Sequence, residues 1–183
     1  MPVEGIRKTA TYLTFTLGEE VFAVDVQKVR EVLDFSSITK VPRTPDFMRG
    51  VINLRGSVVP VIDMRLKFGM DGTEETVDTC VIVMEVSLDD ETTVIGAMAD
   101  SVKEVFDLDP EQIEPPPRIG TSLNTEFIHG MGKHNEQFII ILDIDRIFSA
   151  DELILVGASG INTAKAGEEE ASVARTVQQE QQA

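Results

Sequence analysis

Two aspartates, Asp63 and Asp143, are the residues best placed for acid–base chemistry, because each ends an apolar run that occurs twice in the chain. Two carboxylates held close together could donate and accept protons in turn. Each aspartate also directly precedes a short predicted helical turn, where its side chain would accept hydrogen bonds from free backbone N–H groups and contribute about 1 kcal/mol. We therefore interpret both as helix caps of repeated units rather than as a catalytic pair.

The other residues capable of chemistry form weaker patterns. The two histidines, His129 and His134, lie in or beside one predicted hairpin and could meet across its turn, but no carboxylate–histidine spacing typical of a metal site accompanies them. Cys80 is the only cysteine, and its apolar surroundings favour a buried structural thiol over a nucleophile. The acidic residues 89–91 lack the glycine and the spacing of a calcium loop. We expect no enzyme activity, no metal and no cofactor, and hence a role in binding.

Charge and composition exclude several classes of partner. The 183 residues carry a formal net charge of -16, which repels nucleic acids and anionic lipid headgroups, and 42% of them are hydrophobic, as in a folded globular protein. The longest apolar runs are strand-sized, far below the roughly 18 residues of a membrane span, and the sequence shows no signal peptide. We expect a cytoplasmic protein with no nucleic-acid binding and no direct membrane insertion, whose partners are other proteins.

Apolar runs joined by short polar turns predict strands and hairpins. Residues 12–17 alternate strictly between apolar and polar side chains and predict a strand with Leu13, Phe15 and Leu17 inward. Hairpins are expected between three pairs of segments, namely 12–17 with 21–26, 79–86 with 92–98, and 127–131 with 137–142.

Helical segments are predicted to be few and short. Each has a capping residue or proline at its start and a glycine at its end. They are residues 64–68 between Asp63 and Gly69, residues 44–50, and a terminal helix that opens with a capping box at residues 149–152 and ends at Gly157. With so little helix, the sequence predicts an all-β protein.

Four short segments of the first half recur in the same order in the second half. The matching pairs are 29–34 with 102–107, 38–42 with 113–117, 47–50 with 127–130, and 61–63 with 141–143. Such a repeat predicts two homologous lobes. Each would hold about five strands and be too small to bury enough apolar surface alone, so we expect a hydrophobic core shared between the lobes.

The composition changes after Gly157. Residues 158–183 are rich in alanine, glutamine and glutamate and contain no aromatic residue and no leucine. Such a segment has too little apolar surface to offset the entropy lost on ordering. We expect one domain at residues 1–157, made of the two lobes, followed by a flexible C-terminal tail at residues 158–183.

Six segments carry a resemblance to a known family. They are 15–26 (FTLGEEVFAVDV), 29–32 (VREV), 45–56 (PDFMRGVINLRG), 58–65 (VVPVIDMR), 95–102 (IGAMADSV) and 142–145 (LDID). Together, from about Tyr12 to about Gly157, they resemble CheW, the coupling-protein family of bacterial chemotaxis. The resemblance implies two SH3-like five-stranded β-barrel lobes around a shared hydrophobic core, which agrees with the repeat.

The same resemblance implies a non-enzymatic adaptor in signal transduction. Such a protein couples the cytoplasmic tips of chemoreceptors, the methyl-accepting chemotaxis proteins, to the regulatory domain of the histidine kinase CheA, and takes part in ring assembly within membrane receptor arrays. The same adaptor role in a non-flagellar chemosensory pathway is an alternative that the residues do not separate from chemotaxis. A small acidic β-barrel enzyme or ligand-binding domain, using the aspartates or the histidine hairpin, is the alternative from a different class.

Six residues fall, by resemblance, on positions near the receptor and kinase surfaces. They are Val29, Glu31, Gly50, Arg55, Val102 and Val105. Glu31 and Arg55 are expected to face each other, and an arginine can hold a carboxylate through two parallel hydrogen bonds. Gly56 accounts for the turn beside Arg55 by accepting positive φ, whereas solubility alone does not select an arginine there. The valines fit either the core or an exposed apolar strip that accepts a receptor helix.

Overall fold

The computed structural model describes residues 8–35, 37–88, 90–116, 127–149 and 152, and most of its regular structure is strand. The strands are β1 (Ala10–Leu17), β2 (Glu20–Asp25), β3 (Val29–Asp34), β4 (Met48–Leu54), β5 (Ser57–Asp63), β6 (Cys80–Leu88), β7 (Glu91–Ala99), β8 (Ser101–Leu108), β9 (Ile113–Glu114), β10 (Ile128–His134) and β11 (Gln137–Leu142). The helices among the described residues are α1 (Met64–Lys67) and the 3-10 turns η1 (Val26–Lys28), η2 (Pro110–Gln112) and η3 (Ile144–Arg146).

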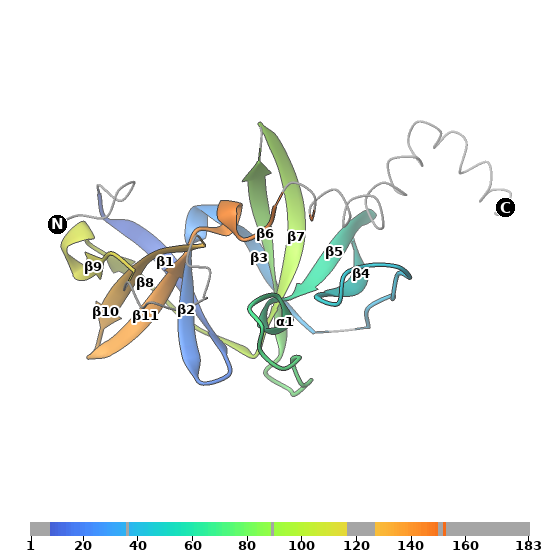
Figure 1. Cartoon of the computed structure of the whole chain (residues 1–183), viewed down its shortest axis with the longest axis horizontal. Coiled ribbons are helices and arrows are strands. Elements are labelled where there is room, and N and C mark those ends of the chain that lie inside the picture. The colour runs from blue at the N-terminus through green and yellow to red at the C-terminus, as the bar shows by residue number, and fades with distance from the viewer. Residues whose placement is uncertain (1–7, 36, 89, 117–126, 150–151, 153–183) are drawn as a thin grey trace, which may run out of the picture.

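The strands form two mixed sheets that lie side by side as two lobes (Figure 1). One sheet has the strand order β8-β1-β2-β11-β10-β9 and is named here the six-stranded lobe; the other, β3-β6-β7-β5-β4, is the five-stranded lobe. Each lobe contains one parallel pair, β2 with β11 and β5 with β7. The predicted all-β fold of two lobes with short helices is confirmed.

The two sheets share one strand arrangement. The strands β8, β1, β2, β11 and β10 hold, in that order, the places that β3, β6, β7, β5 and β4 hold in the other sheet. The repeat found in the sequence thus corresponds to equivalent strands. Equivalent backbone hydrogen bonds also close both lobes: Asp63 N–H donates to the Phe47 carbonyl across 2.6 Å, and Asp143 N–H donates to the Phe127 carbonyl across 2.8 Å.

The lobes are not simply the two halves of the chain. The hairpin β1–β2 at the start of the chain pairs with β8 and β11 near its end, whereas β3 to β7 form the five-stranded lobe from one continuous stretch. Because β1 and β2 hold the places of β6 and β7, the six-stranded lobe is a circular permutation of the other. The sequence comparison missed this equivalence because it matched segments only in the same order.

The predicted shared core lies between the two sheets. Side chains alternate along a strand, so Leu13, Phe15 and Leu17 of β1 point to one side, where they are buried in the same cluster as Met84 of β6 and Ile95 of β7. Each lobe also keeps a smaller apolar cluster made by the alternate residues of its strands. Burial of apolar surface from both sheets joins the lobes into one folded unit.

The corner after β5 forms as predicted, but an earlier helical turn does not. Asp63 caps α1, and Gly69 follows it with a φ of 80°. The helix predicted at residues 44–50 is wrong. A turn closed by a hydrogen bond from Met48 N–H to the Pro45 carbonyl, 2.9 Å long, leads directly into β4. Pairing of β4 with β5 outweighs the local helix signal there.

Two predictions near the C-terminus are refined. The last hairpin turns at residues 135–136, because β10 runs as far as His134. The predicted capping box is present: Ser149 N–H donates to the Glu152 carboxylate across 3.0 Å, and Glu152 N–H donates to the Ser149 hydroxyl across 3.1 Å. Gly157 and the tail lie outside the described residues.

Candidate partner-binding surface

The ion pair expected between Glu31 and Arg55 is present. Glu31 lies on β3, at the edge of the five-stranded sheet, and Arg55 lies in the turn between β4 and β5. A guanidinium nitrogen of Arg55 donates to a carboxylate oxygen of Glu31 across 2.5 Å, so the structure shows one hydrogen bond where two parallel ones were expected. The Arg55 side chain is 68% exposed. An exposed pair contributes only about 0–1 kcal/mol to folding, so this one adds little to the stability of the protein.

The backbone of the β4–β5 turn sets the direction of Arg55. Arg55 and Gly56 have φ values of 50° and 89°, the left-handed conformation that a two-residue hairpin turn uses. The Asn53 side chain accepts a hydrogen bond from Gly56 N–H across 2.8 Å and fixes the turn. A left-handed conformation costs a non-glycine residue about 1–2 kcal/mol. The turn therefore does not itself favour an arginine, which points to a use for the side chain.

A groove of about 600 Å³ lies beside this ion pair. Residues of β3, of the β4–β5 hairpin and of β7 line it. Leu54, Val58 and Val94 contribute apolar surface, while Glu31 and Arg55 contribute charge. Serine, threonine and Arg30 side chains complete the lining, and such a mixture of apolar, polar and charged groups suits contact with another protein.

The predicted valines divide into two kinds. Val29 and Val102 are half-buried and pack against the shared core. Val105 on β8 is 52% exposed, and Val32 on β3 is 42% exposed. Sequence reasoning missed Val32, although the repeat makes it the equivalent of Val105 and could have identified it. Both exposed valines lie on strands that end their sheets, so each lobe presents an apolar side chain on an edge strand.

Gly50 has a clear backbone role. It is buried in β4 with a φ of 148°. A side-chain carbon at this position would lie 2.2 Å from the Thr39 carbonyl oxygen and 2.5 Å from a methyl carbon of Ile38. Thr39 and Val51 exchange backbone hydrogen bonds of 3.0 and 2.8 Å beside it. Glycine allows the two chain segments to approach this closely, so a substitution would disturb the fold before it affected any partner.

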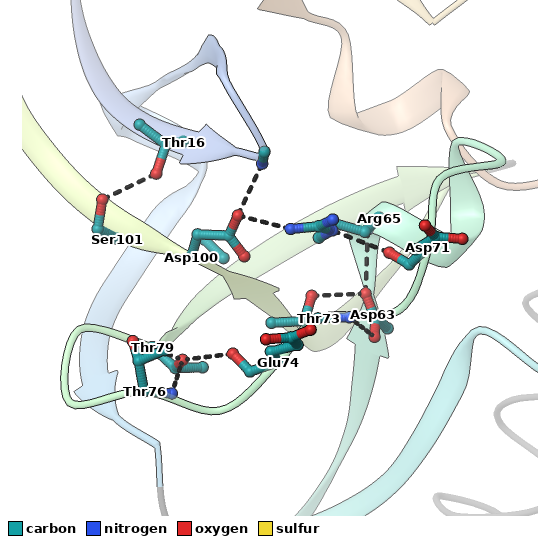
Figure 2. Close-up of polar contacts among 12 residues, drawn as sticks. Thr16, Asp63, Arg65, Asp71, Thr73, Glu74, Thr76, Thr79, Asp100 and Ser101 are labelled. Carbon is teal, nitrogen blue, oxygen red and sulfur yellow. Dashed lines mark hydrogen bonds and ion pairs between the residues drawn. The ribbon is translucent and has the colours of Figure 1, made fainter.

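Asp63 is fully buried, and its carboxylate accepts several hydrogen bonds (Figure 2). One oxygen accepts from the Thr73 hydroxyl at 2.8 Å and from Arg65 N–H at 3.1 Å; the other accepts from Thr73 N–H at 3.0 Å and from the Arg49 guanidinium at 2.9 Å. The predicted cap is confirmed. The carboxylate also holds the segment after α1 against the end of β5, as a buried charge must be paired and hydrogen-bonded.

Asp143 and the two histidines, the other residues considered for chemistry, have contacts of the kind that stabilise a fold. Asp143 caps η3, where its carboxylate accepts a hydrogen bond from Asp145 N–H across 3.2 Å. The His134 ring stacks on the Phe106 ring with centroids 3.8 Å apart, and His129 is half-buried in β10. Within the described ranges, no group of three or more histidine, cysteine, aspartate or glutamate side chains could hold a metal ion.

Cys80 is buried at the start of β6. Burial, together with the nearby carboxylates of Asp34 and Asp100, raises the pKa of its thiol to about 11. The thiolate is the reactive form of cysteine, so this residue is a core side chain rather than a nucleophile. In the part of the chain that the structure describes, no helix has the length and apolar character needed to cross a membrane.

The two related β-lobes and the core between them define a two-lobed all-β domain with an exposed edge strand in each lobe. The chain belongs to the CheW-like domain family, whose family model matches residues 11–152. It is 39% identical to the chemotaxis protein CheW of Klebsiella aerogenes over 145 residues, which cover 79% of this chain and 85% of that protein. It is also 30% identical to the chemotaxis protein CheW of Treponema pallidum, covering 77% and 83% of the two chains.

A solved structure agrees with this family. The crystal structure of the scaffolding protein TtCheW from Thermoanaerobacter tengcongensis matches with a TM-score of 0.69 and 35% sequence identity, over 83% of this chain and 96% of that one. The family is one of chemotaxis adaptors and scaffolds. The resemblance noticed in the sequence is therefore confirmed.

Proposed function

We propose that the protein couples the cytoplasmic tips of chemoreceptors to the regulatory domain of the histidine kinase CheA, without changing any covalent bond itself. The family match over residues 11–152 carries this proposal, because it includes both lobes and therefore both sets of exposed surfaces. The buried Asp63 supports the non-enzymatic part, since its carboxylate oxygens are already occupied by structural hydrogen bonds.

The edge valines support a helical receptor segment as one partner. Val32 and Val105 are exposed on equivalent strands, and Val29 and Val102 lie half-buried near them in sequence. A helix with an apolar face can pack against exposed apolar side chains of this kind. The Arg55–Glu31 pair would then orient the β4–β5 hairpin beside the bound partner.

The repeated architecture supports the kinase as the second partner. The regulatory domain of CheA is expected to have the same two-lobed fold as this family, so lobes of the two proteins could meet through related surfaces. A contact between two different lobes is heterologous, and such contacts generate rings when the rotation between subunits closes. On this proposal, the protein acts in the cytoplasm, is recruited to membrane receptor arrays and takes part in their ring assembly.

Reconstitution tests the proposal directly. Purified protein mixed with a CheA fragment that contains the regulatory domain, and with a receptor cytoplasmic fragment, should sediment as a ternary complex. Omission of the protein should separate kinase from receptor. Failure to associate with either fragment, together with a tightly bound metal or metabolite in the purified protein, would instead favour the ligand-binding or enzyme alternative.

The choice between flagellar chemotaxis and another chemosensory pathway needs a separate measurement. Both would use the same binding surfaces, so the ternary complex does not separate them. Deletion of the gene should abolish swimming chemotaxis in the first case. In the second, it should change pilus-dependent movement or second-messenger levels and leave swimming chemotaxis intact.

A further inference from the structure

One carboxylate contacts both lobes where the chain crosses from β7 to β8 (Figure 2). Asp100 lies at this crossing, and one of its carboxylate oxygens accepts from Gly18 N–H at 2.6 Å and from the Arg65 guanidinium at 2.9 Å. Gly18 belongs to the β1–β2 turn of the six-stranded lobe, whereas Arg65 belongs to α1 of the five-stranded lobe. The backbone N–H of Asp100 also donates to the Thr16 carbonyl across 3.0 Å. We name Gly18, Arg65 and Asp100 the first clamp.

A second carboxylate links the lobes beside the other crossing, which leads from β2 to β3. Asp145 lies in η3, just after the six-stranded lobe has been completed by β11. One of its oxygens accepts from Ser87 N–H in β6 at 2.7 Å, and the other accepts from the Lys28 ammonium in η1 at 2.7 Å. We name Lys28, Ser87 and Asp145 the second clamp.

The two clamps occupy equivalent places with their charges exchanged. Arg65 is two residues beyond the cap Asp63, and Asp145 is two residues beyond the equivalent cap Asp143. The remaining members also correspond. Asp100 and Lys28 each lie in the connection before an edge strand, β8 or β3, and Gly18 and Ser87 each lie at or beside a hairpin turn. In the first clamp the residue after the cap, Arg65, is the cation and the residue on the crossing, Asp100, is the anion. In the second clamp the residue after the cap is the anion Asp145, and the residue on the crossing is the cation Lys28.

We propose that the two clamps fix the angle between the lobes. The core shared by the lobes is apolar, and apolar contact is not directional, so packed sheets can slide by small amounts upon one another. Hydrogen bonds to charged groups are directional and short, and each clamp ties both lobes to one carboxylate. The Arg65 side chain is further positioned by a bond from its Nε to the Asp71 carbonyl, 2.8 Å long.

The position of the clamps gives the angle a functional consequence, which rests on the proposed function. Asp100 and Lys28 come directly before β8 and β3, the edge strands that carry Val105 and Val32. A change of angle between the lobes would move these two edges relative to each other. A partner that contacts both edges would therefore bind best when both clamps are closed, whereas a partner that contacts one lobe would be insensitive to them.

Distance measurements in the isolated protein test the clamps without any partner. Spin labels placed by Gln137→Cys in the six-stranded lobe and Asp34→Cys in the five-stranded lobe report the separation of the lobes by pulsed electron paramagnetic resonance. Both positions are exposed. The native Cys80 is buried, so labelling will select the introduced thiols. We expect Asp100→Ala and Asp145→Ala each to broaden or shift the distance distribution, and the double variant to do so more.

A matched control and a rescue make the result specific. Glu85→Ala removes the ion pair with Arg30, 3.0 Å long, which lies within the five-stranded lobe, and should leave the distribution unchanged. Arg65→Asp combined with Asp100→Lys recreates the polarity of the second clamp, and should narrow the distribution that Asp100→Ala broadens. Thermal unfolding of every variant shows that the labels report on folded protein.

The outcomes separate this inference from the proposed function. Wild-type distances in the folded Asp100→Ala, Asp145→Ala double variant would overturn the clamps, whatever the partners do. Altered distances with unchanged affinity for receptor and kinase fragments would uphold the clamps and remove their link to binding. Altered distances with weaker receptor binding, restored by the charge-exchanged variant, is the result that we expect.

Discussion

The β4–β5 and β10–β11 hairpins hold the same place in the two lobes, yet they carry different chemistry. In the five-stranded lobe, the tip residue Arg55 reaches Glu31 on β3. In the six-stranded lobe, the tip residues are Asn135 and Glu136, with φ values of 51° and 63°, and the equivalent of Glu31 is Glu104. Both turns form from two left-handed residues, so the hairpin needs no ion pair. The pair therefore belongs to the surface of one lobe and not to the fold.

The same comparison applies to the two capping aspartates and predicts the largest effect. Asp63→Ala should lower the free energy of unfolding by about 3 kcal/mol, because it removes hydrogen bonds to buried Thr73 and leaves the half-buried Arg49 without its main partner. Asp143→Ala should cost only about 1 kcal/mol, the value of a cap. Denaturant unfolding of both variants measures the difference. Equal losses would mean that the equivalent caps have equivalent roles, against the contacts described.

Two glycines of the five-stranded lobe separate close packing from turn conformation. Gly50→Ala should lower the free energy of unfolding by about 2 kcal/mol, because the new carbon meets the Thr39 carbonyl. Gly56→Ala meets nothing within 4 Å and should cost about 1 kcal/mol through its positive φ alone. Gly50→Asp should likewise weaken receptor and kinase binding together, through the fold. Selective loss of receptor binding at an unchanged melting temperature would instead make Gly50 a direct contact.

The edge valines test whether the lobes contribute equally to binding. Val32→Asp and Val105→Asp should each lower the free energy of unfolding by no more than about 1 kcal/mol, since both side chains are about half exposed. Each should weaken receptor binding by roughly tenfold, as loss of an apolar anchor does. Titration calorimetry with a receptor fragment gives the affinities. Val77→Asp is the control, because Val77 is 98% exposed but lies on neither edge strand. An effect at only one edge would show that the lobes divide the partners between them.

The ion pair itself should have a small effect on stability and a clear effect on activity. Arg55→Ala and Glu31→Ala should change the free energy of unfolding by about 0–1 kcal/mol, while lowering receptor-dependent kinase activation in a reconstituted array. Glu31→Arg together with Arg55→Glu should restore part of the activity that each single reversal loses. Asn135→Arg, which places a cation on the equivalent hairpin tip of the other lobe, should not restore the kinase activation lost in Arg55→Ala. If Glu31→Arg and Arg55→Glu each kept wild-type activity, Arg55 would serve only as a polar residue of an exposed turn.

The smallest effect is expected from residues outside both lobes. Deletion of residues 158–183 should leave the free energy of unfolding and kinase binding unchanged within about 0.5 kcal/mol, because the segment contains little apolar surface. Unfolding curves and kinase titrations of the truncated protein check this. Sharp, well-dispersed amide resonances from the tail in the full chain would show that it docks after all.

The elements that could be predicted are those that depend on a pattern within one short segment of the sequence. The alternation of β1 gave its buried face, and the apolar run ending at Asp63 gave the cap of α1. The contacts of Asp63 with Thr73 and Arg49 were not predictable, because no periodic pattern relates a strand end to a later loop. Local signals also failed at Met48, where strand pairing replaced a helical turn.

The candidate surface was predicted partly from the residues and partly from resemblance. The repeat identified β3 and β8 as equivalent and could have supplied Val32. The contact of Glu31 with Arg55 came from resemblance to the family, and the structure then showed it. The clamps could not be predicted from the sequence. Gly18 and Asp100 meet because β1 and β2 pair with strands from late in the chain, and the repeat was matched in one order only.

The circular permutation of the six-stranded lobe has a consequence for how the protein is made. The β1–β2 hairpin leaves the ribosome first, but β8 and β11, its neighbours in the sheet, are translated last. The five-stranded lobe is contiguous, so all of its strands have been made once β7 emerges, but the core that it shares with the other lobe is completed only with β11. Until then the apolar face of the hairpin, with Phe15 and Phe22, is open to other nascent chains and to chaperones. The strands of one lobe are thus complete before those of the other, and the shared core closes only when the last strand has been made.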